Sequence, residues 1–258
     1  MKISVVTAVF NNHEMIGAAL DSVLSQSHPH VEVIVIDGMS TDGTRAVLEG
    51  YSNRLNVYVS EPDGGTYHAL NKGIGLATGD VLGFMHSDDE FADSRALERV
   101  ANAFEDESVE AVYGDLVYVR KDDVNRVVRR WVAGAHHKGL LSRGWMPPHP
   151  TFYVRREVYQ RLGRFDTNFV IAADYDCMVR FFCADIKTAY VPHVQVRMRM
   201  GGASNRSLRN IVRKSLEDYT ILRRNRVGGI VALFRKNASK LPQFFLETRS
   251  TNKESDGR

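Results

Sequence analysis

Near the start of the chain stands Ile3-Ser-Val-Val-Thr-Ala-Val-Phe-Asn-Asn12, an apolar and β-branched run that ends in two asparagines. Runs of this kind favour strands that are buried on both faces of a parallel sheet. Similar apolar runs recur further along, at 31–36, 55–59 and 81–85. Stretches with helical periodicity separate them, at 13–25, 42–50, 66–77 and 93–105. The alternation predicts repeated βαβ units around a parallel sheet.

The second half of the chain follows a different pattern. Apolar stretches at 111–119 and 127–132 predict strands of a mixed or antiparallel extension. A helix is expected after Asp174, where four apolar residues share one helical face. The elements expected after it are a strand at 187–199 and helices at 206–224 and 229–246. The predicted fold class is α/β, with a mostly parallel central sheet flanked by helices.

Composition excludes several classes of protein. Hydrophobic residues make up 43% of the 258 residues and charged residues 25%, which is ordinary for a folded, soluble-type chain. No uncharged apolar run approaches the roughly 18–20 residues that cross a bilayer. The two cysteines, Cys177 and Cys183, lack the spacing of a zinc site and make no disulfide framework. We therefore expect a reducing, cytoplasmic setting.

The last part of the chain is basic. Residues 206–246 hold ten Lys and Arg against two acidic residues. Within them, 226–246 combines apolar residues with interspersed cations, which is typical of a helix lying in an anionic membrane interface. Nucleic-acid binding is the other function of a basic patch, but no recognition motif accompanies it, and a contact between copies is the remaining alternative. We predict peripheral membrane contact through 226–246 and no nucleic-acid partner.

Polar residues follow each of the first four predicted strands. They are Phe10-Asn-Asn12, Asp37-Gly38, Glu61-Pro-Asp-Gly-Gly65 and His86-Ser-Asp-Asp-Glu90. Because parallel α/β sheets bind ligands at the carboxyl ends of their strands, these four segments predict one site. The glycines of Gly73-Ile-Gly75-Leu-Ala-Thr-Gly79 end a helix instead of opening one, so no dinucleotide cofactor is expected.

The acidic segment after the fourth strand is the most informative of the four. Adjacent carboxylates repel one another unless a cation lies between them and a ligand. Mg²⁺ and Mn²⁺ accept one or two carboxylates together with substrate phosphates, so the segment is compatible with a metal bound to a diphosphate. The alternative is a solvated helix N-terminus, where acidic residues stabilise the helix dipole.

Seven motifs occur in order along residues 1–204. They are Ser4-Val-Val-Thr-Ala-Val-Phe-Asn-Asn12, Val35-Ile-Asp-Gly-Met-Ser-Thr-Asp-Gly-Thr44, Ser60-Glu-Pro-Asp-Gly-Gly-Thr-Tyr-His-Ala-Leu-Asn-Lys-Gly-Ile74, Phe84-Met-His-Ser-Asp-Asp89, Gly163-Arg-Phe-Asp166, Ala173-Asp-Tyr-Asp176 and Met200-Gly-Gly-Ala-Ser204. In these motifs the chain resembles the family-2 glycosyltransferases of the GT-A nucleotide-diphospho-sugar-binding fold. Within that family it is most similar to bacterial transferases of capsule, exopolysaccharide and colanic-acid type.

The resemblance implies a division of the chain. A GT-A domain would cover 1–204, with a nucleotide-binding half at 1–110 and an acceptor-binding half at 111–204. A basic amphipathic helical extension at 205–247 and a flexible tail at 248–258 would follow.

The resemblance also implies donor-binding and metal-binding residues. The donor would lie against Thr7, Val9, Asn11, Asp37, Asp63, Asn71 and Ser87. In this set Asp37 would accept a hydrogen bond from the base, although an aspartate at a strand tip also commonly forms an Asx turn. Asp88 matches the metal ligand of the family's Asp-x-Asp motif, and His86 stands where the first aspartate usually does. The implied metal is Mn²⁺ or Mg²⁺.

The family's catalytic base is an aspartate in an acidic pair that opens a helix. It matches Asp174, while Ala173 replaces the usual glutamate and Asp176 is the second choice. Helix capping is the structural alternative for both aspartates. The resemblance further implies that His149 approaches the acceptor and that Arg199 and Gly202 approach the diphosphate. For these residues, a structural histidine in a Pro-rich loop and an arginine on an edge strand are the alternatives.

The expected function is an inverting, metal-dependent glycosyltransferase. It would move a sugar from a UDP, GDP or dTDP donor to a glycan or lipid-linked acceptor. The setting would be cell-surface polysaccharide or glycolipid biosynthesis at the cytoplasmic face of the cell membrane. Two other functions remain open from the sequence. One is a catalytically silent nucleotide-sugar-binding partner, and the other is a sugar-nucleotide pyrophosphorylase.

Overall fold

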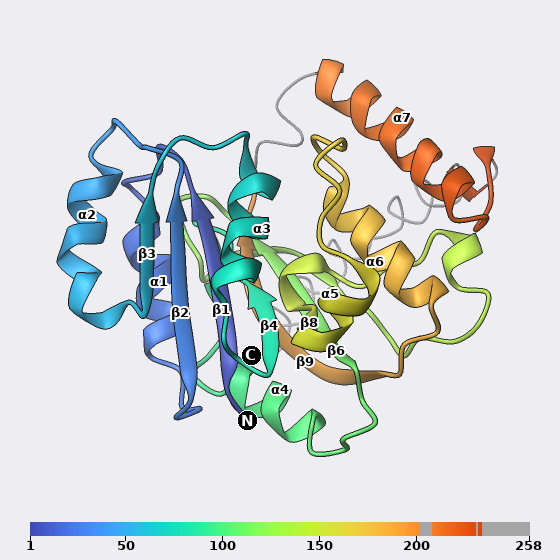
Figure 1. The fold of residues 1–258 in the computed structure, drawn as a ribbon, viewed down its shortest axis with the longest axis horizontal. Helices are drawn as coiled ribbons and strands as arrows, with labels where there is room; N and C mark the ends of the chain where they lie inside the picture. The colour runs from blue at the N-terminus through green and yellow to red at the C-terminus, as the bar shows by residue number, and fades with distance from the viewer. Residues whose placement is uncertain (202–207, 231, 234–258) are drawn as a thin grey trace, which may run out of the picture.

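The computed structural model describes residues 1–201, 208–230 and 232–233 (Figure 1). Gly202, most of the helix expected at 229–246 and the tail at 248–258 lie outside the described residues. The chain forms one nine-stranded sheet with helices on both faces, which confirms the predicted α/β class (Figure 1). Within the described part of the chain, no helix is both long and apolar enough to cross a membrane.

The first half of the sheet is parallel, as predicted. Its strands are β1 (Ile3–Val9), β2 (Val31–Asp37), β3 (Val57–Ser60) and β4 (Val81–Phe84). β1 pairs in parallel with β2 on one side and with β4 on the other, and β2 pairs in parallel with β3. All four strands therefore end at the same edge of the sheet.

The second half of the sheet is mixed. Its strands are β5 (Glu90–Phe91), β6 (Ala111–Val119), β7 (Val127–Trp131), β8 (Tyr153–Arg155) and β9 (Thr188–Arg199). The strand order is β3-β2-β1-β4-β8-β6-β9-β5, with β7 beside β6. β8 is antiparallel to both of its neighbours, β4 and β6, whereas β6 and β9 are parallel. The antiparallel extension was predicted, but its strand order was not.

Two apolar clusters cover the two faces of the sheet, because alternate residues of each strand point to opposite sides. The helices of one face are α1 (Ile16–Leu24), α2 (Thr44–Tyr51) and α4 (Ala96–Ala103), and those of the other are α3 (Thr66–Leu76), α5 (Arg156–Leu162) and α6 (Ala173–Cys183). Single turns of 3₁₀ helix lie at Ser52–Arg54, Leu141–Arg143 and His149–Thr151.

The last described helix, α7 (Leu208–Arg224), lies across α6 (Figure 1). Its residues Ile221 and Leu222 are fully buried and belong to the same apolar cluster as α3, α5 and α6. The described part of the predicted extension at 205–247 is therefore continuous with the core of the preceding residues.

Some expectations about elements were wrong or incomplete. The strand expected at 55–59 was predicted to be buried on both faces, yet every residue of β3 is only half-buried, because β3 forms an edge of the sheet. β5, β8 and α5 were not predicted at all. β5 and β8 have two and three residues, and α5 has seven, too few to show a periodicity.

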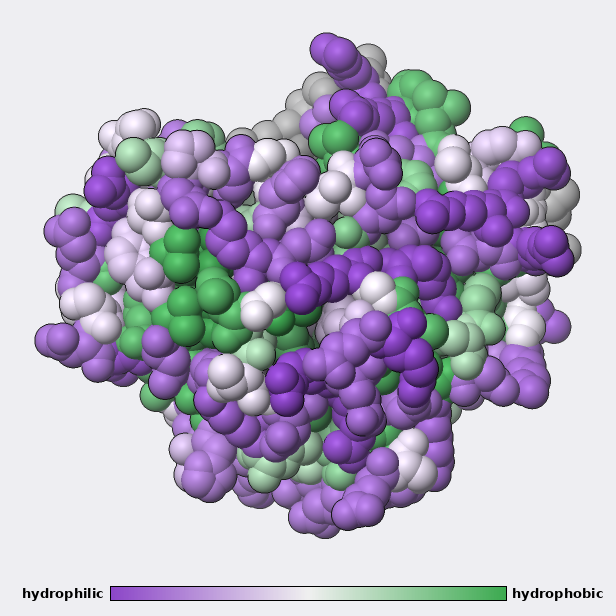
Figure 2. Space-filling view, in the orientation of Figure 1, coloured by the Kyte–Doolittle hydropathy of each residue, from purple (hydrophilic) through white to green (hydrophobic). Residues whose placement is uncertain are grey.

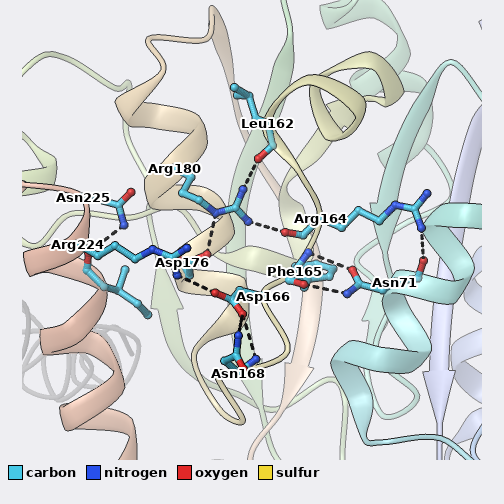
Figure 3. A network of polar contacts seen from close by, with 11 residues as sticks. Asn71, Leu162, Arg164, Phe165, Asp166, Asn168, Asp176, Arg180, Arg224 and Asn225 are labelled. Carbon is cyan, nitrogen blue, oxygen red and sulfur yellow. Dashed lines mark hydrogen bonds and ion pairs between the residues drawn. The ribbon is translucent and has the colours of Figure 1, made fainter.

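A polar network connects α3, α6 and α7 to the loop that joins α5 and α6 (Figure 3). The Asn71 amide donates to the carbonyl of Phe165 at 2.9 Å, and its oxygen accepts the Phe165 N–H at 3.0 Å. Arg180 donates to Asp176 at 2.7 Å and to the carbonyls of Leu162 and Arg164. Asn71 and Arg180 thus hold the loop against its helices.

The Asn71 contacts lead to a stability prediction. Asn71→Ala leaves two backbone groups of Phe165 without their partner, so the free energy of unfolding should fall by about 1–3 kcal/mol. Binding of nucleoside diphosphates should not change. Urea unfolding and calorimetric titration measure the two effects. Asn168→Ala, an exposed amide in the same loop, is the control and should lower the stability by less than about 0.5 kcal/mol. Weakened nucleotide binding at unchanged stability would instead support a contact between Asn71 and the donor.

Candidate functional site

The carboxyl ends of the parallel strands meet at one edge of the sheet, as predicted. In the sheet register Val9 lies beside Asp37, and Asp37 lies beside Ser60. The Gly38 N–H donates to the carbonyl of Val9 at 2.9 Å, which joins the turns after β1 and β2. The polar segments that follow β1, β2 and β3 therefore start at the same level, whereas β4 ends beside Val6, three residues before the end of β1.

Phe10 and Asp63 converge on Gly38. A Cβ atom added to Gly38 would lie 3.0 Å from Asp63 Oδ2 and 3.3 Å from Phe10 Cδ2. The Phe10 side chain is 64% exposed, and Asp63 is exposed as well, while its Oδ1 accepts the Gly65 N–H at 2.7 Å. An exposed aromatic residue and a carboxylate oxygen thus both lie close to the position that a Cβ atom of Gly38 would occupy. This arrangement suits a planar group that carries an N–H.

Asp37 and Asn11 form hydrogen bonds with the turn after β2. The buried Asp37 carboxylate accepts hydrogen bonds from the hydroxyls of Ser40 and Ser60, the latter at 2.6 Å. Asn11, which has a positive φ of 49°, accepts the Thr41 N–H through its side chain at 2.8 Å. These contacts favour the Asx-turn alternative for Asp37, and its contact with a base stays a prediction.

Three other residues that were predicted to bind the nucleotide-sugar donor do not have free, exposed side chains at this edge. Thr7 is fully buried and Val9 is 4% exposed, and Val9 belongs to the apolar cluster under α1, α2 and α4. The Asn71 amide is occupied by the backbone of Phe165. The side chains of Thr7, Val9 and Asn71 are thus buried or hydrogen-bonded within the protein, and a contact of these positions with the donor stays a prediction.

The turn after β4 carries the predicted metal ligand. Asp88 is half-buried, and no described residue makes a hydrogen bond or ion pair with its carboxylate. Ser87 accepts a hydrogen bond from the Asn12 side chain at 2.9 Å, which joins this turn to the end of β1. Asp89 is fully buried, and burial together with the charge of Asp88 raises its pKa well above the usual value.

Arg199 holds this turn in place. Its guanidinium donates to the carbonyl of Asp88 at 3.0 Å and pairs with Glu90 at 2.6 Å, and its backbone N–H donates to Asp89 at 3.1 Å. These contacts favour the structural alternative for Arg199, and its contact with a diphosphate stays a prediction. The partner assigned with it, Gly202, lies outside the described residues.

The turn fits a divalent cation that is bound mainly by substrate. Among the described residues, no three His, Cys, Asp or Glu side chains converge in a way that could hold a metal ion. Asp88 nevertheless offers a carboxylate that has no partner among the described residues, next to Ser87 in the chain. Because Mg²⁺ and Mn²⁺ often take one or two carboxylates plus phosphate oxygens, this single ligand is compatible with a metal that arrives with a diphosphate.

His149 lies next to this turn, inside the protein. Its ring stacks on Phe84 at a centroid distance of 5.5 Å and lies 5.8 Å from the ring of His86. Burial lowers the pKa of His149 to about 4, so the ring is neutral at pH 7. A neutral ring on an apolar floor is compatible with the structural alternative as well as with an approach to a sugar.

Asp174 stands in the first turn of α6, on the same side of the sheet as His149. The Tyr67 hydroxyl lies 3.0 Å from Asp174 Oδ1 and 2.8 Å from the carbonyl of Ile171. Tyr67 belongs to the motif Ser60–Ile74, and no role was predicted for it. A tyrosine one residue into a helix carries no signal for this contact, because its partner lies 107 residues away.

The surroundings of Asp174 lower its pKa. Burial by itself would raise it, but His149, Lys214, the Tyr175 N–H and the Tyr67 hydroxyl together outweigh burial. The charge of His149 is the largest of these lowering contributions, followed by that of Lys214. Asp174 is therefore an ionised carboxylate at neutral pH. Lys214 belongs to α7, which was not expected to contribute to the site.

Asp176 has a different role from Asp174. It is fully buried, and its Oδ2 accepts the Arg180 guanidinium at 2.7 Å. Arg180 in turn holds the loop between α5 and α6 (Figure 3). The second choice for the base is thus a structural ion pair. Of the predicted residues, Asp63, Ser87, Asp88, His149 and Asp174 lie along the edge of the sheet or the α6 side next to it.

Comparison with known proteins agrees with this geometry. The sequence profile of glycosyl transferase family 2 matches residues 4–177. A PGL/p-HBAD biosynthesis glycosyltransferase of Mycobacterium bovis is 30% identical over 209 residues, which are 78% of this chain and 78% of that protein. TuaG of Bacillus subtilis, which has a provisional assignment as a teichuronic acid biosynthesis glycosyltransferase, is 40% identical over 92 residues, or 34% of this chain and 36% of TuaG.

Solved structures show the same fold at low sequence identity. TarS of Staphylococcus aureus superimposes with a TM-score of 0.66 at 19% identity, over 98% of this chain and 44% of the TarS chain. The chain thus spans less than half of TarS. The mannosyltransferase PcManGT of Pyrobaculum calidifontis, in complex with GDP-Man and Mn²⁺, gives 0.65 at 20% identity, over 93% of this chain and 74% of that one.

The family match covers both halves of the site, from the end of β1 to the first turn of α6. The chain belongs to glycosyl transferase family 2 and is a glycosyltransferase with the GT-A fold.

Proposed function

We propose that the protein is an inverting, metal-assisted glycosyltransferase that moves a sugar from a nucleoside diphosphate to a hydroxyl group of a glycan or lipid-linked acceptor. The observation that carries the proposal is the contact of the Tyr67 hydroxyl with Asp174 Oδ1 at 3.0 Å in the first turn of α6, and the lowered pKa of Asp174 supports it. Cell-surface polysaccharide or glycolipid biosynthesis is the proposed setting, supported by the relative named for teichuronic acid biosynthesis.

The donor would bind at the edge formed by β1, β2 and β3. Phe10 offers a face on which a base can stack, and Asp63 Oδ2 offers an acceptor for a base N–H. Solved relatives contain UDP-GlcNAc in TarS and GDP-Man in PcManGT. A UDP, GDP or dTDP sugar is the proposed class of donor.

The diphosphate would lie at the turn after β4. Asp88 would hold Mn²⁺ or Mg²⁺ there, and the cation would supply positive charge to the departing diphosphate. Mn²⁺ in the PcManGT complex supports this choice of ion. Arg199 contributes by fixing the backbone of Asp88 and the side chain of Glu90.

Asp174 would act as the general base. As the acceptor oxygen attacks the anomeric carbon, a new carbon–oxygen bond forms and the bond from that carbon to the diphosphate breaks on the opposite side. Asp174 takes the hydroxyl proton in the same displacement. A single displacement inverts the anomeric configuration, and one carboxylate is sufficient because a neutralised diphosphate leaves readily. His149 stays neutral and shapes the floor of the site.

Membrane contact is proposed for the outer face of α7, defined as Arg209, Val212, Leu216, Tyr219 and Arg223. Val212 is 60% exposed and Leu216 is 63% exposed, while the two acidic residues of the helix, Glu217 and Asp218, are buried. The exposed charges of α7 are therefore all positive. Figure 2 shows hydrophobic and hydrophilic surface side by side along this helix. Such a face suits an anionic bilayer. The segment first predicted for this role, 226–246, lies mostly outside the described residues.

The role of Asp174 can be tested by substitution. Asp174→Asn should lower kcat by about 10²–10⁴-fold, because the amide cannot accept the proton, while the affinity for the donor changes by less than about threefold. Turnover and calorimetric titration on the same preparation measure both quantities. The matched variant is Asp176→Asn, which weakens a buried ion pair and should lower stability by about 3 kcal/mol with kcat per folded molecule retained. The reverse pattern would make Asp176 the base.

The metal site can be tested by donor binding. Of the UDP, GDP and dTDP sugars, only one nucleotide class should raise the melting temperature of the protein. The increase should be larger with Mn²⁺ than with EDTA. Asp88→Asn should remove the part of this increase in melting temperature that depends on Mn²⁺. Asp93→Asn, a nearby surface acid, should keep it. If Asp88→Asn and wild type respond equally to Mn²⁺, the carboxylate does not hold the ion.

Membrane contact can be tested with lipid vesicles. The double variant Val212→Glu, Leu216→Glu should reduce binding to phosphatidylglycerol vesicles at least about tenfold, because it loses apolar contact and adds negative charge. Sedimentation with vesicles of phosphatidylglycerol and of phosphatidylcholine measures the effect. Val132→Glu, at an apolar residue that is 59% exposed outside α7, is the control. Unchanged sedimentation of the double variant would remove the outer face of α7 from the proposal.

A further inference from the structure

Glu217 of α7 binds the segment that leads into α6. Its carboxylate accepts the backbone N–H groups of three consecutive residues, Val170 at 3.1 Å, Ile171 at 2.9 Å and Ala172 at 2.9 Å. Glu217 is only 9% exposed, and its one charged partner among the described residues is Arg213, at 3.1 Å. A carboxylate that receives three peptide N–H groups fixes the backbone that donates them, since hydrogen bonds to a charged acceptor are short and strong.

This segment is directly connected to Asp174. Ala172 is the residue before α6, and its carbonyl accepts the Asp176 N–H at 2.9 Å in the first turn. The carbonyl of Ile171 accepts from the Tyr67 hydroxyl, which also contacts Asp174. Tyr67 has only one hydroxyl hydrogen, so the place of the Ile171 carbonyl influences how that hydrogen is shared with Asp174.

The same helix also sets the electrostatics of the site. Lys214, one turn before Glu217, lowers the pKa of Asp174, and the charge of Glu217 contributes to the raised pKa of Tyr67, which is caused mainly by burial. A Tyr67 hydroxyl that keeps its proton remains a donor to Asp174. Glu217 thus acts on the surroundings of Asp174 by backbone contact and by charge.

We propose that Glu217 is a positioning residue for Asp174, so that α7 is a working part of the site and not only an appendage. The inference rests on the proposed role of Asp174 as the base. It goes beyond the family match, because the matched region ends at residue 177 and Glu217 lies after it. Glu217 itself does not touch substrate. It holds residues 170–172, and these set where the base stands.

The first test is Glu217→Gln in the full chain. The amide keeps one acceptor oxygen but turns an N–H₂ group toward peptide N–H groups, so residues 170–172 lose part of their anchor. We expect kcat to fall about tenfold or more with a donor dissociation constant that changes less than about twofold, since small misplacements of a reacting group are costly. Arg213→Met is the matched control. It removes the ion pair and leaves the backbone contacts, so kcat should stay within about twofold.

A double-mutant cycle separates positioning from plain loss of folded protein. In the Asp174→Asn background, Glu217→Gln should change the residual turnover less than about twofold, because the group through which it acts is gone. A merely structural role would lower turnover by the same factor in both backgrounds, and this result would overturn the inference. If Asp174→Asn retains full activity, the proposed base is wrong and the inference fails with it. Normal turnover of Glu217→Gln beside an inactive Asp174→Asn overturns the inference alone.

Two further variants keep the test decisive. Glu217→Asp retains the charge but withdraws the carboxylate by one methylene, and it replaces Glu217→Gln where that variant does not fold; we expect an intermediate loss of kcat. Tyr67→Phe replaces Asp174→Asn where residual turnover is too low to measure. Its effect on kcat should be non-additive with that of Glu217→Gln, and strict additivity would contradict the coupling.

Discussion

The parallel pairing of β1 with β2 and β4 is the constraint on which the site depends. It sets Val9 beside Asp37 and Val6 beside Phe84, so that the turns after the three strands start at one edge. A slip of one residue would turn every side chain of a strand to the other face and would misalign these turns. The buried apolar residues of β1 on both faces make such a slip unfavourable, since each belongs to a packed cluster.

The mixed half of the sheet fixes the turn that carries Asp88 and places His149, although the proposed nucleotide contacts come from the parallel half. β9 contributes Arg199, which fixes the backbone of the Asp88 turn. The 3₁₀ turn before β8 contributes His149, stacked on Phe84 of β4. α6 starts on the same side with Asp174. The relative places of Asp88 and Asp174 therefore follow from how the second half packs on the first.

The sequence predicted the strands, the shared edge and the residue types at it, because these follow from local patterns such as apolar runs and the polar segments that end them. It did not predict which polar side chains form hydrogen bonds or ion pairs within the protein. Asn71 is bound by Phe165, Arg199 by Glu90, and Glu217 by residues 170–172, and each pair is at least 45 residues apart. Long-range partners of this kind depend on tertiary packing, which leaves no periodicity in a single chain. Short elements such as β5 and β8 were missed for the related reason that two or three residues show no pattern.

The two departures from the family pattern are compatible with an ionised base. Ala173 is fully buried in the core, where a glutamate would place a second negative charge next to Asp174 and raise the pKa of that carboxylate. With alanine there, His149, Lys214 and the Tyr67 hydroxyl act on a single carboxylate, and the pKa of Asp174 is lowered despite burial. His86, which replaces the first aspartate of the family's metal motif, likewise removes a negative charge, here at the turn after β4. Its ring lies beside that of His149. The site then has two carboxylates with different surroundings: Asp88 has no hydrogen-bond or ion-pair partner among the described residues, and Asp174 accepts the Tyr67 hydroxyl. In the proposed mechanism Asp88 would bind the metal ion and Asp174 would accept the proton of the acceptor hydroxyl.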